Sequence, residues 1–188
     1  MHCVDPIRDP KKINAMKNYL KGKNKRDHAL FAVGINVALR ISDLLSLTWG
    51  DVLEGKRFKP IQLKEGKTLK PRSIKLNKVA QKALEGLLEG LDSFGMEDYI
   101  FKSREGVNSP ITRQQALNVL KDAAKAVGVK ENVGTHTLRK TWGYHAWKNG
   151  FSPALIMETL NHSNLNVTKR YLGIRQDEIN DLYDSLNL

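Results

Sequence analysis

Two residues at the start of one predicted helix could bind a phosphate together. His136 and Arg139 are three positions apart in a helix that we expect to end before Gly150. With this spacing they share a face near the helix start, where the positive end of the helix dipole favours a phosphate. Arg139 and Arg40 could each present a planar guanidinium fork to the non-bridging oxygens of a phosphodiester. Taken singly, Arg40 could be only a cation at a helix C-terminus, and Arg139 only a salt-bridge partner.

Helices and a small sheet are expected to position these side chains. A helix can begin at Asp9-Pro10 and run to about Lys21, before a basic turn at 21–26. Apolar residues predict a second helix from about Asp27 to Leu39, which ends beside Arg40. Segments near 58–63 and 72–76 alternate like strands, and a basic turn joins them. Further helices are predicted for about 77–88, 112–127, 135–149, 152–160, 165–171 and 175–185, with Ser42, Asn77, Thr112, Thr135 and Ser152 as candidate N-caps.

The charge balance favours a polyanionic partner. The 188 residues include 31 lysines and arginines against 20 aspartates and glutamates, a formal net charge of +11. Such a surface fits nucleic acid, although many basic proteins bind nothing specific. The single cysteine, Cys3, excludes an internal disulfide and a cysteine-rich metal site, and a reducing, cytoplasmic setting fits. No stretch approaches the roughly 20 apolar residues of a membrane span, so no membrane partner is expected.

Five segments resemble, in chain order, the motifs of the tyrosine recombinase (phage integrase) family, enzymes that break and rejoin DNA. The resemblance spans about residues 27–184. Each motif alone is weak evidence, and the resemblance depends on their joint spacing: 23 positions separate Arg139 from His162 and 9 separate His162 from Tyr171. The segments are Ala38–Leu47 (first arginine box), Lys67–Leu76 (β-hairpin lysine), His136–Arg139 (His-x-x-Arg box), Leu160–Ser163 (second histidine) and Thr168–Leu172 (nucleophile).

The resemblance implies that Tyr171 is the nucleophile. A free phenol has a pKa near ~10 and is mostly protonated at neutral pH. The guanidinium groups of Arg40 and Arg139 and a histidine base would favour the phenolate. His136 would accept the tyrosine proton or hydrogen-bond the phosphate. His162 would donate to a phosphate oxygen.

The resemblance also implies a general acid on the hairpin. Lys67 would protonate the departing 5′ oxygen, with Lys64 and Lys70 as alternatives on the same turn. Because these side chains would supply both charge and proton, no cofactor, metal ion or small-molecule substrate is expected. Two positions depart from the family pattern: Lys140 stands where a histidine is frequent, and Asn161 where a glycine is common.

The expected architecture is a single α+β domain, mainly helical, with a small three-stranded antiparallel sheet. Residues 1–9 are expected to form a loose leader, and 10–188 the catalytic domain. Family members usually carry a helical DNA-clamping domain before the first arginine box. Only 39 residues precede Arg40, so that domain is expected to be absent, in a fragment or in a short natural form.

The function implied by the resemblance is site-specific recombination or integration of double-stranded DNA for a mobile element. Tyr171 would form a covalent 3′-phosphotyrosyl intermediate, and a tetramer would exchange C-terminal segments, here Asp181–Leu188. Two alternatives stay open: relaxation of DNA like a type IB topoisomerase, and a non-catalytic DNA-binding remnant of a mobile element. All six candidates, Arg40, Lys67, His136, Arg139, His162 and Tyr171, are retained, which argues against the remnant.

Overall fold

Four helices begin at the capping side chains that the sequence predicts. The computed structural model describes residues 4–64, 71–173 and 176–186. A side-chain oxygen before each of these helices accepts a backbone N–H of the first turn, which would otherwise lack a partner. The confirmed caps are Asp9 for α1 (Pro10–Lys23), Asn77 for α5 (Lys78–Leu88), Thr112 for α6 (Arg113–Ala126) and Ser152 for α8 (Pro153–Thr159).

Two predicted caps are wrong, and both lie near candidate site residues. Helix α3 (Ile41–Leu45) begins directly after Arg40, and the Ser42 hydroxyl inside it donates to the Asp43 carboxylate instead. Helix α7 (Thr137–Lys148) begins after His136 rather than at Thr135. The arginine and histidine of the candidate site therefore occupy the N-cap positions themselves.

The basic turn expected at 21–26 is a single-residue break between two helices. Helix α1 continues to Lys23, and α2 (Lys25–Val37) starts two residues later. Asn24 ends the first helix by donating its N–H to the Leu20 carbonyl oxygen at 2.8 Å. Its side chain begins the second by accepting from the N–H of Arg26 and of Asp27.

The strands form two antiparallel pairs in the described residues, not the one three-stranded sheet expected. After the short helix α4 (Trp49–Val52), β1 (Leu53–Glu54) pairs with β2 (Arg57–Phe58), and β3 (Ile61–Lys64) with β4 (Pro71–Ile74). Lys59-Pro60 separates β2 from β3, and a proline has no N–H to continue a ladder.

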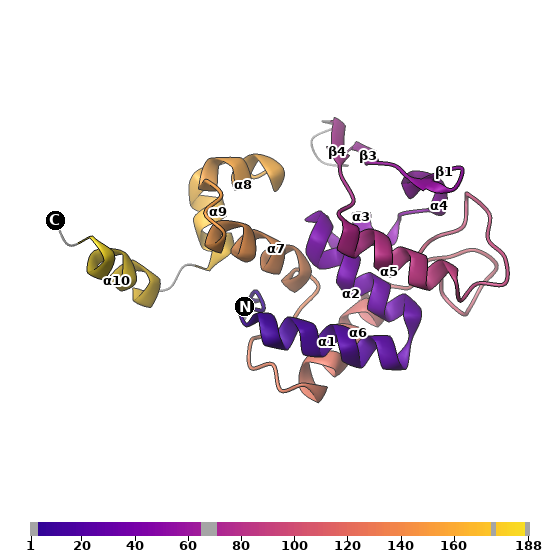
Figure 1. Ribbon diagram of the computed structural model, residues 1–188, viewed down its shortest axis with the longest axis horizontal. Helices are drawn as coiled ribbons and strands as arrows, with labels where there is room; N and C mark the ends of the chain where they lie inside the picture. Colours follow the sequence, from indigo (N-terminus) through magenta and orange to yellow (C-terminus); the bar gives the residue numbers. More distant parts are fainter. Residues whose placement is uncertain (1–3, 65–70, 174–175, 187–188) are drawn as a thin grey trace.

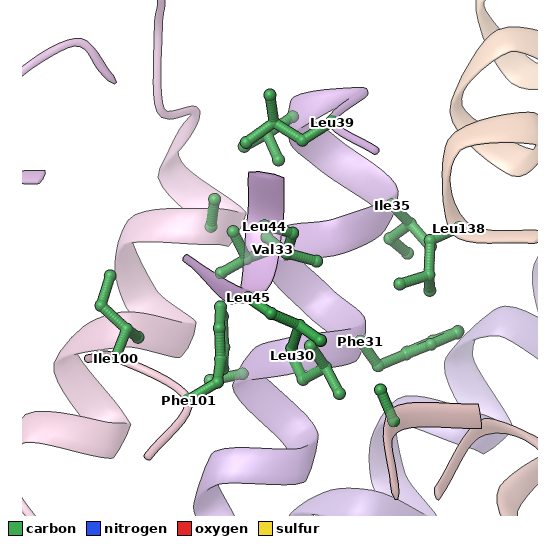
Figure 2. Close-up of a cluster of buried hydrophobic side chains, with 14 of the residues drawn as sticks. Leu30, Phe31, Val33, Ile35, Leu39, Leu44, Leu45, Ile100, Phe101 and Leu138 are labelled. Carbon is green, nitrogen blue, oxygen red and sulfur yellow. The ribbon is translucent and has the colours of Figure 1, made fainter. Parts of the chain in front are cut away.

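Helix α2 is the centre of the hydrophobic core and leads to Arg40. Its residues from Ala29 to Ile35 are buried, and Figure 2 shows Leu30, Phe31 and Val33 among side chains from α3 and the 100–101 segment. Leu138 of α7 enters the same cluster. A Cβ atom at Gly34 would lie 2.6 Å from the Leu138 Cδ1 atom, so glycine permits this close approach of α7 to α2.

A second, smaller cluster joins α7 to α8 and α9 (Leu165–Leu172). Ala38, Ile156, Leu160 and Leu172 are buried there, with Tyr171 packed at its side. Figure 1 shows α7, α8 and α9 together, whereas the last helix, α10 (Gln176–Ser185), stands apart from them. Among the described residues, no helix is long and apolar enough to cross a membrane.

Residues 4–9 are not the loose leader that the sequence suggested. Ile7 is fully buried, and its N–H donates to the Thr141 hydroxyl of α7 at 2.9 Å. The N–H of Asp5 donates to the Asn132 carbonyl oxygen at 3.0 Å. These contacts join residues more than 120 positions apart in sequence, which explains why local sequence patterns did not predict them.

Candidate active site

Arg139 is buried at the first turn of α7 and points toward the second cluster. Only 3% of its surface is exposed. Its Nη2 atom donates to the Leu160 carbonyl oxygen at the end of α8, which fixes one side of the guanidinium fork. A buried arginine fixed by a carbonyl is preorganised for bidentate binding of a phosphate.

Arg40 follows an unusual turn at the end of α2. Ala38, the C-cap of that helix, has a φ of 54°, in the left-handed region that disfavours a residue with a Cβ atom. The chain then extends at Arg40 before α3 begins. The turn brings the Arg40 charge close enough to Tyr171 to lower the pKa of its phenol, as the Arg139 charge does.

Tyr171 lies on α9 with its hydroxyl buried. Burial raises the pKa of this phenol to about 12, although the charges of Arg139 and Arg40 oppose the rise. No described residue accepts a hydrogen bond from the Tyr171 hydroxyl. In the protein alone the nucleophile candidate is therefore a neutral phenol, and the arginines next to it favour its anion.

His162 is in contact with Tyr171. The centroids of the two rings are 4.8 Å apart at an interplanar angle of 70°. The His162 Nδ1 atom lies 3.0 Å from the hydroxyl oxygen of Thr168, a fully buried residue one turn before Tyr171. This hydrogen bond orients the imidazole and couples it to helix α9.

The backbone accounts for Asn161, which stands where the resemblance implies a glycine. Its φ is 47°, so the chain turns through the left-handed region directly before His162. Glycine adopts this conformation without strain, and asparagine tolerates it better than other residues. The turn that carries His162 is therefore compatible with the substitution.

His136 lies at the edge of the site. Its side chain is exposed, but neighbouring groups remove part of its water and lower its pKa below the ordinary 6.5. The charges of Arg113, Arg139, Lys140 and Arg40 lower the pKa further. A neutral imidazole at neutral pH can accept a proton, which is what a general base requires.

Three residues of this site were not predicted to act in it. Lys140 is buried, and its Nζ atom lies 5.2 Å from the centroid of the Tyr171 ring. Thr168 holds His162, and the charge of Arg113 acts on His136. Lys140 was visible in the sequence only as a departure from the family pattern. Thr168 belongs to the segment that resembles the nucleophile motif, but no role was expected of it, and nothing in the sequence pointed to Arg113.

The structure thus brings Arg40, Arg139, His162 and Tyr171 together, with His136 at the rim. Lys67 and Lys70 lie outside the described residues. Lys64 pairs with Pro71 across β3 and β4, so the segment that carries Lys67 connects these two strands. Within the described ranges there is no group of three or more histidine, cysteine, aspartate or glutamate side chains that could hold a metal ion.

The comparison with protein families identifies the family. The model of the phage integrase family matches residues 8–178. The chain belongs to this family. A probable integrase/recombinase of Bacillus subtilis, YoeC, is 42% identical over 183 residues, which are 97% of each chain. Tyrosine recombinase XerD of Halalkalibacterium halodurans is 27% identical over 178 residues, and the match spans 58% of that longer relative.

Solved structures confirm the fold class. The chain superimposes on the crystal structure of XerA recombinase with a TM-score of 0.79 and 19% identity, over all of this chain and 67% of the other. It superimposes on XerH site-specific recombinase, in a post-cleavage complex with a palindromic difH substrate, with a TM-score of 0.72 and 18% identity. That match covers 96% of this chain and 53% of XerH, so both similarities concern one part of longer proteins.

Proposed function

We propose that this chain cleaves and rejoins double-stranded DNA at specific sites, through a covalent 3′-phosphotyrosyl link to Tyr171. The observation that carries the proposal is the burial of the Tyr171 phenol beside Arg139, Arg40 and His162, in a member of the phage integrase family. A mobile-element integrase is the role that fits this family. Binding to the DNA backbone is supported by the net charge of +11.

The first half of the reaction is an in-line displacement at phosphorus. The Tyr171 oxygen loses its proton, for which His136 is the candidate acceptor, and bonds to the phosphorus. The bond from phosphorus to the 5′ oxygen breaks, and Lys67 gives that oxygen a proton. Arg40 and Arg139 bind the non-bridging oxygens, where negative charge grows in the transition state.

The second half reverses these steps. A 5′ hydroxyl of the same or a partner strand attacks the phosphotyrosyl link and releases Tyr171. The covalent link keeps the energy of the phosphodiester bond, so rejoining needs no ATP. His162 would donate a hydrogen bond to a phosphate oxygen, while its Nδ1 atom stays with Thr168.

Self-association on DNA is the second part of the proposal. Helix α10 exposes the side chains of Ile179 and Tyr183, and Leu186, directly after its end, is exposed as well. A largely apolar hollow of about 540 Å³ lies beside α7 and α8, where Phe151 and Leu155 are about half exposed. Docking of α10, which includes most of Asp181–Leu188, into this hollow of a neighbour would link protomers into a ring of four.

Covalent trapping tests the proposed chemistry. A DNA substrate nicked beside the cleavage site loses a short fragment after cleavage, which prevents rejoining and accumulates the adduct. We expect an adduct that mass spectrometry maps to Tyr171. Tyr171→Phe should form none and still bind DNA, because only one hydroxyl is lost. The matched control is Tyr19→Phe, which removes a hydroxyl on α1 near Lys23 and should react like the natural protein.

The same experiment separates the alternatives. An adduct that persists in Tyr171→Phe contradicts the assignment of the nucleophile. DNA binding without any adduct would support the non-catalytic remnant. Relaxation of a supercoiled plasmid that carries no second recombination site would instead favour the topoisomerase.

A further inference from the structure

The N-terminal strap, residues Val4–Asp9, runs along one face of helix α7. The Thr137 hydroxyl donates to the Asp5 carbonyl oxygen at 3.0 Å, and the Thr141 hydroxyl accepts the Ile7 N–H at 2.9 Å. One turn later, the His145 Nε2 atom lies 3.0 Å from the Ile7 carbonyl oxygen. Positions 137, 141 and 145 share one helix face, so the strap is bonded to three successive turns of α7.

The opposite face of α7 packs against the nucleophile helix. A Cβ atom at Gly143 would lie 3.2 Å from the Leu172 Cδ2 atom and 3.5 Å from the Leu160 Cδ1 atom. Position 143 projects from the helix about 200° away from position 141, at 100° per residue. Helix α7 is therefore held between the strap on one side and α9 on the other.

Arg8 bridges the two sides. Its Nη2 atom donates to the Gly173 carbonyl oxygen at 2.5 Å, two residues beyond Tyr171. Its guanidinium carbon lies 4.9 Å from the centroid of the Tyr144 ring on α7. Gly173 is the C-cap of α9, in the left-handed conformation with a φ of 63°, and its N–H donates to the Lys169 carbonyl oxygen. The guanidinium thus contacts the negative end of the nucleophile helix while it lies against α7.

A charged donor at this place restrains the helix in two ways. Hydrogen bonds from a guanidinium are about twice as strong as those between neutral groups. A cation at a helix C-terminus also opposes the fraying of the last turn, which here contains Tyr171. The Gly173 carbonyl is the last described backbone group before α10. The hydrogen bond from Arg8 to this carbonyl therefore lies between Tyr171 and the C-terminal helix.

We propose that Arg8 is a positioning residue for Tyr171: it fixes the end of α9 against α7, so that the phenol keeps its place when the C-terminal helix moves to a neighbouring protomer. This inference rests on the proposed function. A loose α9 would still allow DNA to bind, because Arg40 and Arg139, the proposed phosphate ligands, are on other elements. It would slow the chemical step, since a misplacement of about 1 Å can cost roughly a hundredfold in rate.

Two substitutions at Arg8 and one matched control test the proposal. Arg8→Met keeps a long stem against Tyr144 and removes the donor, whereas Arg8→Lys keeps a charged donor. Lys12→Met is the control, because the Lys12 Nζ atom donates to the Val127 carbonyl oxygen at 2.6 Å, at the end of α6 and away from Tyr171. Adduct formation at saturating DNA, DNA affinity and thermal unfolding are measured for each variant.

We expect Arg8→Met to form the adduct at least tenfold more slowly, with DNA affinity within about twofold of the natural protein. The rate of adduct formation in Arg8→Lys should fall between those of Arg8→Met and the natural protein. Lys12→Met should keep the full rate, although it should lose about as much thermal stability as Arg8→Met. A full rate in Arg8→Met, a slowing shared equally by Lys12→Met, or an Arg8→Lys variant as slow as Arg8→Met would each overturn the proposal.

Hydrogen exchange gives a readout that does not depend on activity. Backbone amides of residues 169–173 should exchange faster in Arg8→Met than in the natural protein. In Lys12→Met their exchange rates should not change. If the natural protein formed no adduct, the proposed function would fail, and the exchange experiment would still decide whether Arg8 holds α9. Equal protection of residues 169–173 in Arg8→Met and the natural protein would overturn the positioning role.

Discussion

In the proposed mechanism the proton of Tyr171 has to leave before or during the attack on DNA, and the structure predicts how the rate depends on pH. With a pKa of about 12, only about one Tyr171 in 10⁵ is a phenolate at pH 7, against about one in 10³ for an ordinary tyrosine. Ionisation to solvent would therefore cost about a hundredfold in reactive species. A neutral His136 avoids this cost by accepting the proton in the transition state.

The two routes give different pH profiles. The rate constant is measured with limiting nicked DNA and protein below the Kd, because this condition reports the groups of the free protein. If His136 is the base, the rate should rise about tenfold per pH unit in acid, through the lowered pKa of His136, and stay flat from pH 7 to 9. His136→Gln should lose the plateau, and its residual rate should rise about a hundredfold from pH 7 to 9.

Two further variants assign the acid limb. Positive charge from Arg113 disfavours the imidazolium form of His136, so Arg113→Gln should raise the His136 pKa and move the midpoint to higher pH. His162→Gln should lower the rate but keep the midpoint. A natural protein whose rate climbs a hundredfold between pH 7 and 9, or a His136→Gln variant with an unchanged plateau, would refute the role of His136 as base.

Three other predictions concern the leaving group, the backbone and the DNA. Lys67→Ala should be badly slowed on normal DNA and largely restored on a 5′-bridging phosphorothiolate, because a thiolate leaves without a proton; rescue of a Lys64 or Lys70 variant instead would move the general acid. Asn161→Gly should keep the thermal stability of the protein, whereas Asn161→Ala should lower it by about 1–2 kcal/mol, or roughly 2–8 °C in Tm, because the φ at position 161 is left-handed. Equal melting temperatures of the two variants in calorimetry would contradict this. Affinity for DNA should fall steeply between about 50 and 200 mM salt in a titration, and a flat response would mean that the net charge of +11 is not used for phosphate contacts.

Local chemistry made much of the fold predictable. Asp9-Pro10, Thr112 with Gln115, and Ser152-Pro153 each carry a complete start signal within four residues, and each starts a helix in the structure. The predicted caps at Ser42 and Thr135 were wrong, because these helices begin after Arg40 and His136, and neither hydroxyl lies at the N-cap position. The expected three-stranded sheet was wrong in detail because Pro60 interrupts the ladder.

The candidate site was predictable only through its joint spacing. Tyr171 and His162 have no local signal of function, yet their rings are in contact in the structure. The positioning residues could not be found in this way. Thr168 looks like an ordinary helical threonine, and the strap contains only three apolar side chains, Val4, Pro6 and Ile7, without any helical or strand period. Its contacts with α7 depend on residues more than 120 positions away.

The distribution of buried polar groups explains why helix α7 has a weak amphipathic pattern and still occupies the centre of the site. Burying a hydroxyl or a charge costs free energy unless it finds a partner, so such groups are rare in a core. In the described ranges they concentrate on and around this helix and α9: Thr135, Thr137, Arg139, Lys140, Thr141 and Thr168. The threonines at 137 and 141 find partners in the backbone of the N-terminal strap, and Arg139 finds one in the Leu160 carbonyl. Helix α7 is therefore polar on two buried faces, one bonded to the strap and one directed at Tyr171. Apolar residues at 137 and 141 would leave the Asp5 carbonyl oxygen and the Ile7 N–H without these partners.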